Sequence, residues 1–171
     1  MDILIAVVAE YAVFLIPAGA ALAWWRAPRG EKTSMVVAGV LTLGLTLLAI
    51  ALAAHVWTDP RPFTVDGQTP LVAHLPDNGF PSDHMTIGTA VAATVLGWRR
   101  QLGALLLGVA VVVGAARVAA HIHHIPDIVA GLLIGLACAA ARVSVGRRAI
   151  AHLGERIGRS QVAPDLDRHV N

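Results

Sequence analysis

Three short stretches of the sequence are rich in arginine, histidine, aspartate and serine. These side chains can bind anions, act as nucleophiles or move protons. The stretches are "DPRPF" (59–63), "GFPSDH" (79–84) and "HIHHIPD" (121–127), with Arg117 just before the third. Arg117, His84 and Asp127 each lie at the end of an apolar run. Ionisable groups at such positions are costly and usually face a cavity or one another. We therefore expect the three stretches to form one site.

Three kinds of site fit these residue types. A metal site would use His121, His123 and His124 with nearby carboxylates. An anion site would use Arg61 and Arg117, because arginine offers planar, permanently charged donors that suit phosphate and repel a divalent metal. Histidine adds a nucleophile or a proton near neutral pH. The third possibility is a set of polar residues that are merely satisfied at an interface. The two arginines favour the anion.

The stretch "FPSDHMTIG" adds a helix start to this picture. Ser82 is a good N-cap candidate before an apolar run. The free backbone N–H groups and the dipole at a helix N-terminus favour a bound anion. Ser82 and His84 are placed to contact it.

The elements that must position these residues are apolar helices. The chain has 171 residues, 56% hydrophobic and 14% charged, whereas a soluble domain carries about 25% charged residues. A membrane span needs about 20 mostly apolar residues, and five segments qualify: 3–25, 35–57, 84–98, 102–120 and 127–145. Too few polar residues remain to cover a soluble globule. We predict an all-α, polytopic membrane helix bundle of about five transmembrane helices, with residues 1–145 forming one domain.

The basic residues predict the orientation of this bundle. Lys and Arg in short loops favour the cytoplasm, and all but Arg61 and Arg117 of the 13 fall on one side of the predicted spans. We therefore expect the N-terminus outside, the C-terminus in the cytoplasm, and the polar stretches on the extracytoplasmic side. The pI near 9.3 then reflects anchoring to anionic membrane lipids, and no nucleic acid is expected as a partner.

The segment 146–171 is predicted to be a cytoplasmic tail. Ile150, Leu153 and Ile157 recur at roughly helical spacing among arginines. This pattern is compatible with a short interfacial helix or with a solvated tail, and the end of the chain is expected to be disordered.

Three motifs resemble a known family. Arg61-Pro62, Pro81-Ser82-Asp83-His84 and Arg117-x5-His123-x3-Asp127 resemble the signature motifs of the type 2 phosphatidic acid phosphatase superfamily of membrane lipid phosphatases. The resemblance covers about residues 55 to 130. Many members carry Gly at the position of Asp83. The aspartate here resembles the pattern of the bacterial undecaprenyl-diphosphatase branch. The chain departs from the family at Ala54 and Ala116, where members usually have Lys and Ser, and it has one predicted span fewer than the usual six.

The resemblance implies a role for each motif residue. His123 is expected to be the nucleophile, Asp127 to orient it, and His84 to act as general acid and base. The phosphate group would be held by Arg61, Arg117, Ser82 and Asp83, with no metal and no cofactor. Two further residues are possible contacts: Glu10, an acidic residue within the first span, and His55, beside the usual Lys position. His121 and His124 are expected to flank the site, and His74 and Asp77 to be ordinary loop residues.

The expected substrate is a lipid phosphate that enters from the membrane. The resemblance favours a polyprenyl (undecaprenyl- or decaprenyl-type) diphosphate, hydrolysed to the monophosphate at the outer face of a bacterial plasma membrane. Such a reaction recycles the carrier lipid of cell-wall (peptidoglycan) synthesis. The alternatives are phosphatidylglycerol phosphate or phosphatidic acid as substrate, or a different class of protein, a histidine-cluster metal-binding or transport protein. The sequence sets no oligomeric state.

Overall fold

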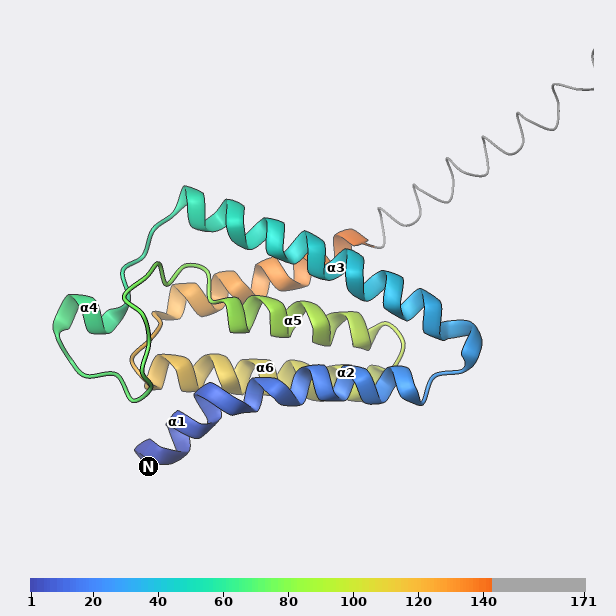
Figure 1. Cartoon of the computed structure of the whole chain (residues 1–171), viewed down its shortest axis with the longest axis horizontal. Helices are drawn as coiled ribbons and strands as arrows, with labels where there is room; N and C mark the ends of the chain where they lie inside the picture. Colours follow the sequence, from blue (N-terminus) through green and yellow to red (C-terminus); the bar gives the residue numbers. More distant parts are fainter. Residues whose placement is uncertain (143–171) are drawn as a thin grey trace, which may run out of the picture.

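Long helices run between two ends of the molecule in the computed structural model, which describes residues 1–142 (Figure 1). The predicted tail 146–171 and residues 143–145 lie outside the described residues. The helices are α1 Asp2–Tyr11, η1 Ala12–Phe14, α2 Leu15–Trp25, α3 Arg29–Val56, α4 Pro62–Asp66, α5 Asp83–Leu96 and α6 Arg100–Ala119, followed by a last helix, Ile125–Arg142. The described residues contain no β-strand, so the all-α prediction is confirmed.

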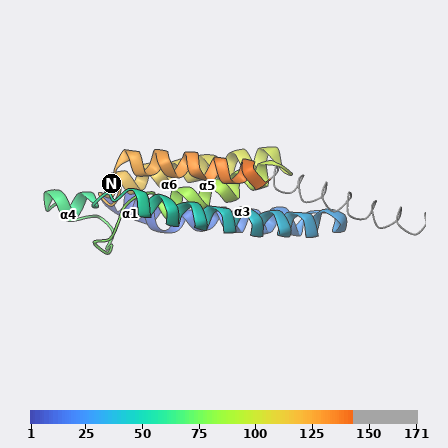
Figure 2. The ribbon, with the colours of Figure 1, turned by 90° about the horizontal axis from the view of Figure 1, so that it is seen from above.

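Within residues 1–142, four segments are long and apolar enough to cross a membrane: Asp2–Trp25, Arg29–Val56, Arg100–Ala119 and Ile125–Arg142. They correspond to four of the five predicted spans. The fifth, 84–98, is helical as α5, but its 14 residues extend only about 21 Å, against about 30 Å of hydrocarbon. α5 packs against α2, α3 and α6, and α3 and the last helix lie on opposite faces of the bundle (Figure 2). This short helix is therefore largely enclosed by protein.

The first predicted span, 3–25, is not one continuous α-helix. A 3-10 turn, Ala12–Phe14, separates α1 from α2, and Pro17 lies in the first turn of α2. Proline has no backbone N–H, and its ring clashes with the carbonyl of the residue four positions earlier, here Val13. The turn removes that conflict and changes the direction of the chain at this point.

Two glycines let the last helix approach the start of α5. A Cβ added at Gly135 would lie 2.5 Å from the Thr86 carbonyl oxygen, and one at Gly131 would lie 3.1 Å from the Ser82 carbonyl oxygen. Small residues four positions apart commonly allow such close helix packing. The contact brings the first turns of the two helices together, and the Ser82 N–H donates to the Asp127 carbonyl oxygen at 3.3 Å.

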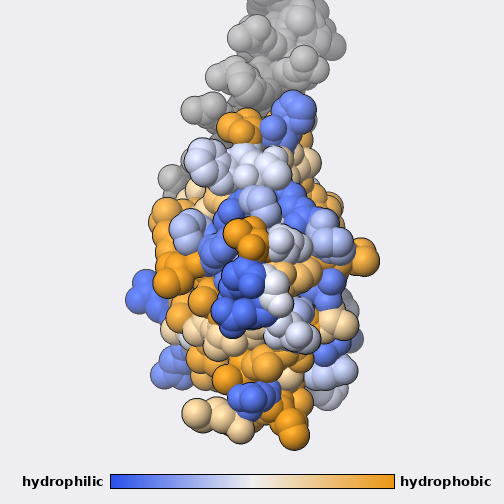
Figure 3. Space-filling view, turned by 90° about the vertical axis from the view of Figure 1, so that its left-hand side faces the viewer, coloured by the Kyte–Doolittle hydropathy of each residue, from blue (hydrophilic) through white to orange (hydrophobic). Residues whose placement is uncertain are grey.

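The three polar stretches lie at one end of the bundle, here called the α4 end. It contains the N-terminus, the segment from Trp57 to Ser82 that includes α4, and the turn between α6 and the last helix (Figure 1). Viewed onto this end, a group of hydrophilic residues lies near the centre, with hydrophobic residues beside and below it and further hydrophilic residues toward the rim (Figure 3). The sequence predicted that these segments share a side. That this side is extracytoplasmic stays a prediction.

Candidate active site

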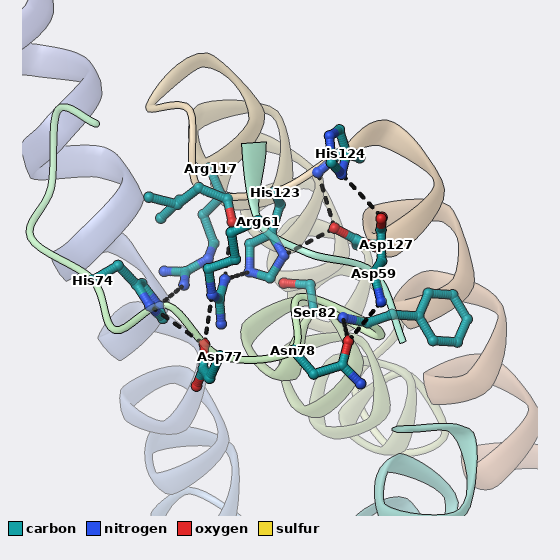
Figure 4. A network of polar contacts seen from close by, with 12 residues as sticks. Asp59, Arg61, His74, Asp77, Asn78, Ser82, Arg117, His123, His124 and Asp127 are labelled. Atoms are coloured by element: carbon teal, nitrogen blue, oxygen red, sulfur yellow. Dashed lines mark hydrogen bonds and ion pairs between the residues drawn. The ribbon is translucent and has the colours of Figure 1, made fainter. Parts of the chain in front are cut away.

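The three polar stretches meet at the α4 end, as their position beside apolar runs predicted (Figure 4). Arg61 is the residue before α4, Ser82 precedes α5, and Arg117 lies in the last turn of α6. His123 comes from the turn after α6, and Asp127 from the start of the last helix. Ser82 and Asp127 are fully buried, and Arg61, Arg117 and His123 are at most 6% exposed. Polar groups at such depth need partners or a ligand.

His123 and Asp127 form a buried pair. The Nδ1 atom of His123 lies 3.3 Å from Oδ2 of Asp127, which also accepts the backbone N–H of His124 at 2.9 Å. An ionised carboxylate only accepts hydrogen bonds, so Nδ1 carries the proton and Nε2 keeps its lone pair. Burial lowers the pKa of His123 below 6.5, although the hydrogen bond from its ring to Asp127 raises it. The imidazole is therefore neutral near pH 7, and its unprotonated nitrogen, Nε2, is the one that can attack.

Arg61 faces that unprotonated nitrogen. Its Nη1 lies 3.3 Å from Nε2 of His123 and donates to the Ile122 carbonyl oxygen at 2.9 Å. Its Nε donates to Oδ1 of Asp77 at 2.6 Å. A permanent positive charge thus lies where the nucleophile would meet its target, an arrangement that suits an anion and disfavours a metal ion on this nitrogen.

Arg117 and Ser82 provide donors that are not used. Nη1 of Arg117 donates to the Ala9 carbonyl oxygen of α1 at 3.1 Å, and Nη2 lies 3.2 Å from Nε2 of His74. Nε of Arg117 and Oγ of Ser82 are buried and have no hydrogen-bond partner among the described residues. Buried polar atoms are nearly always satisfied, and an exception calls for a ligand or another specific cause. These two donors therefore mark a place for an acceptor.

His84 lies beside this place, in the first turn of α5. Its side chain is partly buried, makes no hydrogen bond within residues 1–142, and is within electrostatic range of Arg117 and His123. Ser82 is the N-cap residue of α5, as predicted, but its hydroxyl does not form the expected capping hydrogen bond. The N-terminal amides of α5 and the Ser82 hydroxyl thus remain available to a ligand.

The turn after α6 separates the three neighbouring histidines. His121 has a left-handed φ of 64°, which ends the helical path and reverses the chain. Its Nε2 contacts Oδ2 of Asp66 at 2.7 Å, and Nδ1 of His124 contacts Oδ2 of Asp59 at 2.9 Å. Each of the three histidines therefore has a different carboxylate partner. The metal site that would use all three is not assembled, although Asp59, His124 and Asp127 bring ligand atoms within 4.8 Å of one another.

Three predicted contacts lie outside the hydrogen-bond network of the site, although Glu10 and Asp83 are within electrostatic range of Arg117. Glu10 and His55 are exposed, and neither makes a side-chain hydrogen bond within the described residues. Glu10 lies on the outer surface of α1, and its contact with a substrate stays a prediction. Asp83 is also exposed, in the first turn of α5, where its carboxylate interacts favourably with the helix dipole.

Sequence reasoning missed His74 and Asp77. Both were expected to be ordinary loop residues, yet His74 contacts Arg117 and Asp77 contacts Arg61. Asn78, next to them, accepts the backbone N–H groups of Asp59 and Phe80 and so fixes the path of this loop. One signal was available in the sequence. The loop joins two of the three motifs, so it has to cross the end of the bundle where the motifs meet.

Comparisons with known proteins match the chain to one family. The family model described as "PAP2 superfamily" matches residues 34–150. The chain is 28% identical over 138 residues to "Putative undecaprenyl-diphosphatase YbjG" of Escherichia coli (strain K12), covering 80% of this chain and 69% of that one. It is 26% identical over 129 residues to "Bacitracin transport permease protein BcrC" of Bacillus licheniformis, covering 75% of this chain and 63% of that one.

Two solved structures share the fold. One is LpxE of Aquifex aeolicus, with a TM-score of 0.67, 22% identity, and coverage of 84% of this chain and 85% of that one. The other is a PAP2 type phosphatidylglycerolphosphate phosphatase from Bacillus subtilis, with a TM-score of 0.59, 18% identity, and coverage of 86% and 77%. Family model, sequence relatives and fold agree: the chain belongs to the PAP2 superfamily.

Proposed function

We propose that this protein hydrolyses a lipid phosphate through a phosphohistidine intermediate on His123. The observation that carries the proposal is the buried His123–Asp127 pair, whose unprotonated nitrogen faces Arg61, together with the unpartnered donors of Ser82 and Arg117. A nucleophile oriented by a third group, next to donors that await an anion, is the arrangement that covalent phosphoryl transfer requires.

In the first step, Nε2 of His123 attacks phosphorus and the bond from phosphorus to the leaving oxygen breaks. His84 donates a proton to that oxygen, and Asp127 stabilises the positive charge that develops on the imidazole. In the second step, water attacks the phosphohistidine while His84 accepts a proton from it. The bond between phosphorus and Nε2 then breaks, and phosphate leaves. Both histidines return to their starting protonation states.

The transferred phosphoryl group needs positive charge and directed donors on its oxygens. Arg61, Arg117, the Ser82 hydroxyl and the N-terminal amides of α5 would supply them. Asp83, which the family resemblance grouped with the phosphate contacts, would act on the helix dipole instead, because a carboxylate repels phosphate. The two arginines provide the charge that a metal ion supplies in other phosphatases, so no metal is part of the proposed mechanism.

The substrate we propose is a polyprenyl diphosphate, cleaved to its monophosphate. The name of the Escherichia coli relative, an undecaprenyl-diphosphatase, supports it. A polar site at the end of apolar helices supports it as well, because a lipid head group can enter there while its tail stays in the membrane. The proposed location is the extracytoplasmic face of a bacterial plasma membrane, and the proposed role is recycling of the carrier lipid for cell-wall synthesis. Phosphatidylglycerol phosphate, named for one solved relative, and phosphatidic acid are the second candidates.

Phosphate release from purified protein tests the proposal. We expect hydrolysis of undecaprenyl diphosphate to exceed that of phosphatidylglycerol phosphate and phosphatidic acid, to persist in EDTA, and to be absent from His123→Ala. Release from none of these lipids would contradict the proposed activity. Loss of activity in EDTA, with rescue by a divalent ion, would favour a metal site at Asp59, His124 and Asp127 instead.

A further inference from the structure

The loop between α4 and α5 places one side chain on each arginine of the site. Asp77 receives the Nε–H of Arg61 at 2.6 Å, and His74 accepts from Nη2 of Arg117 at 3.2 Å (Figure 4). The two loop residues also face each other, with His74 Nδ1 4.0 Å from Asp77 Oδ1. The donors that would bind phosphate are thus partly occupied by a carboxylate and an imidazole of the same chain.

The Asp77 carboxylate resembles a phosphate group in the way it binds Arg61. It is an anionic oxygen acceptor on the guanidinium edge, as a phosphate oxygen would be. Phosphate and Asp77 cannot both take the Nε–H in full, and two anions on one guanidinium repel each other. We propose that Asp77 is a built-in competitor of phosphate for Arg61, and that it weakens the binding of the phosphate product so that the site can empty. This inference rests on the proposed phosphatase function.

The structure allows Asp77 to leave without a rearrangement of the loop. Its side chain is 56% exposed, whereas that of Arg61 is 6% exposed, so the carboxylate can turn into solvent while Arg61 stays in place. The backbone on both sides is held. The N–H of Leu71 donates to the Ala120 carbonyl oxygen, and the Asn78 side chain binds the Asp59 N–H. The competition therefore requires one side-chain rotation.

His74 has a different relation to the ligand. It accepts a hydrogen bond from Arg117 through Nε2, and burial, followed by the charge of Arg61, lowers its pKa. It is therefore neutral and does not compete as a charge. Removal of Asp77 alone should accordingly account for most of the effect on phosphate affinity.

The test measures inhibition by inorganic phosphate in the full-length enzyme. In Asp77→Asn, we expect the inhibition constant for phosphate to fall about 5-fold, the upper end of what an exposed ion pair provides. Asp77→Glu keeps the charge and should stay within about 2-fold of wild type. Asp66→Asn is the matched control, because it removes a carboxylate of the α4 end that pairs with His121 and contacts neither arginine.

An unchanged or raised inhibition constant in Asp77→Asn would overturn the inference, and a rise would mean that Asp77 holds Arg61 in its binding position. Thermal stabilisation of purified Asp77→Asn and wild type by inorganic phosphate provides a second measurement that needs no turnover. It tests the competition even if the wild type hydrolyses no lipid, an outcome that would count against the proposed function alone. If the wild type is active and phosphate binds both proteins equally, the inference fails and the proposed function stands.

Discussion

His123 and His124 are adjacent in sequence, yet their rings face different carboxylates, Asp127 and Asp59. The spacing of three residues between His123 and Asp127 lets the ring reach back over the first turn of the last helix. His124 instead contributes its backbone N–H to Asp127. The turn therefore determines which of the three nearby histidines can be the nucleophile, because it directs one ring, that of His123, into the bundle.

The lowered pKa of His123 predicts how activity depends on pH. A nucleophilic imidazole must be neutral, and a pKa below 6.5 means that protonation removes activity only as the pH falls below that value. The acid limb of a plot of kcat/KM against pH should accordingly have its midpoint below 6.5, once the ionisation of the substrate has been measured separately. A midpoint above 6.5 would contradict the assignment of the neutral, buried ring.

The two arginines should not tolerate replacement by lysine. An ammonium keeps the charge but loses the planar set of donors that Arg61 and Arg117 direct at their partners. We expect Arg61→Lys and Arg117→Lys each to lower kcat/KM on the order of 100-fold, the cost of losing one transition-state donor. Arg99→Lys is the control, because Arg99 pairs with Glu31 at the other end of the bundle. Equal rates in all three variants would mean that Arg61 and Arg117 do not bind the reacting group.

At the scale of the elements, the close packing of the last helix on α5 determines where Asp127 and Ser82 meet. Gly135→Ala would place a methyl group 2.5 Å from the Thr86 carbonyl oxygen. We expect a loss of about 1–3 kcal/mol of stability, typical of overpacking, and a lower kcat/KM because the two first turns move apart. Thermal unfolding in detergent measures the loss of stability.

Gly44→Ala supplies the matched control, since a Cβ at that position of α3 meets nothing within 4 Å. Alanine is a better helix former than glycine, so the stability of the Gly44→Ala variant should stay unchanged or rise. Equal stability losses in Gly135→Ala and Gly44→Ala would show that the close contact at Gly135 does not cause the loss.

The length of the apolar runs and the three motifs were enough to predict the long helices and the meeting of Arg61, Ser82, Arg117, His123 and Asp127. Other features depend on tertiary contacts that a sequence pattern does not encode. The contacts of His74 and Asp77 depend on how an irregular loop folds over the end of the bundle. The exposure of Glu10 depends on which face of α1 packs against α6. The turn at Ala12–Phe14 could have been inferred from Pro17, because proline disturbs the preceding turn of a helix.

At the scale of the whole molecule, all the proposed chemistry lies at the α4 end, so the orientation of the bundle decides which compartment receives the product. Thiol labelling of intact cells tests it in a Cys138→Ala background. Gln68→Cys, at the α4 end, should react with a membrane-impermeant reagent, because the basic residues favour the cytoplasm at the opposite end. Thr33→Cys, near Lys32 at that opposite end, should react only after lysis. The reverse pattern would place the site in the cytoplasm.

The identity of the residue that bonds to phosphorus tests the proposed mechanism most directly. His84→Ala should still form the phosphoenzyme from a substrate with a good leaving group, but should hydrolyse it slowly, so the intermediate should accumulate. With labelled phosphate, rapid quenching and peptide mapping by mass spectrometry, we expect an acid-labile label on His123, and none in a variant that also carries His123→Ala. A label on His121 or His124, or full activity in His123→Ala, would contradict the assignment of His123 as the nucleophile.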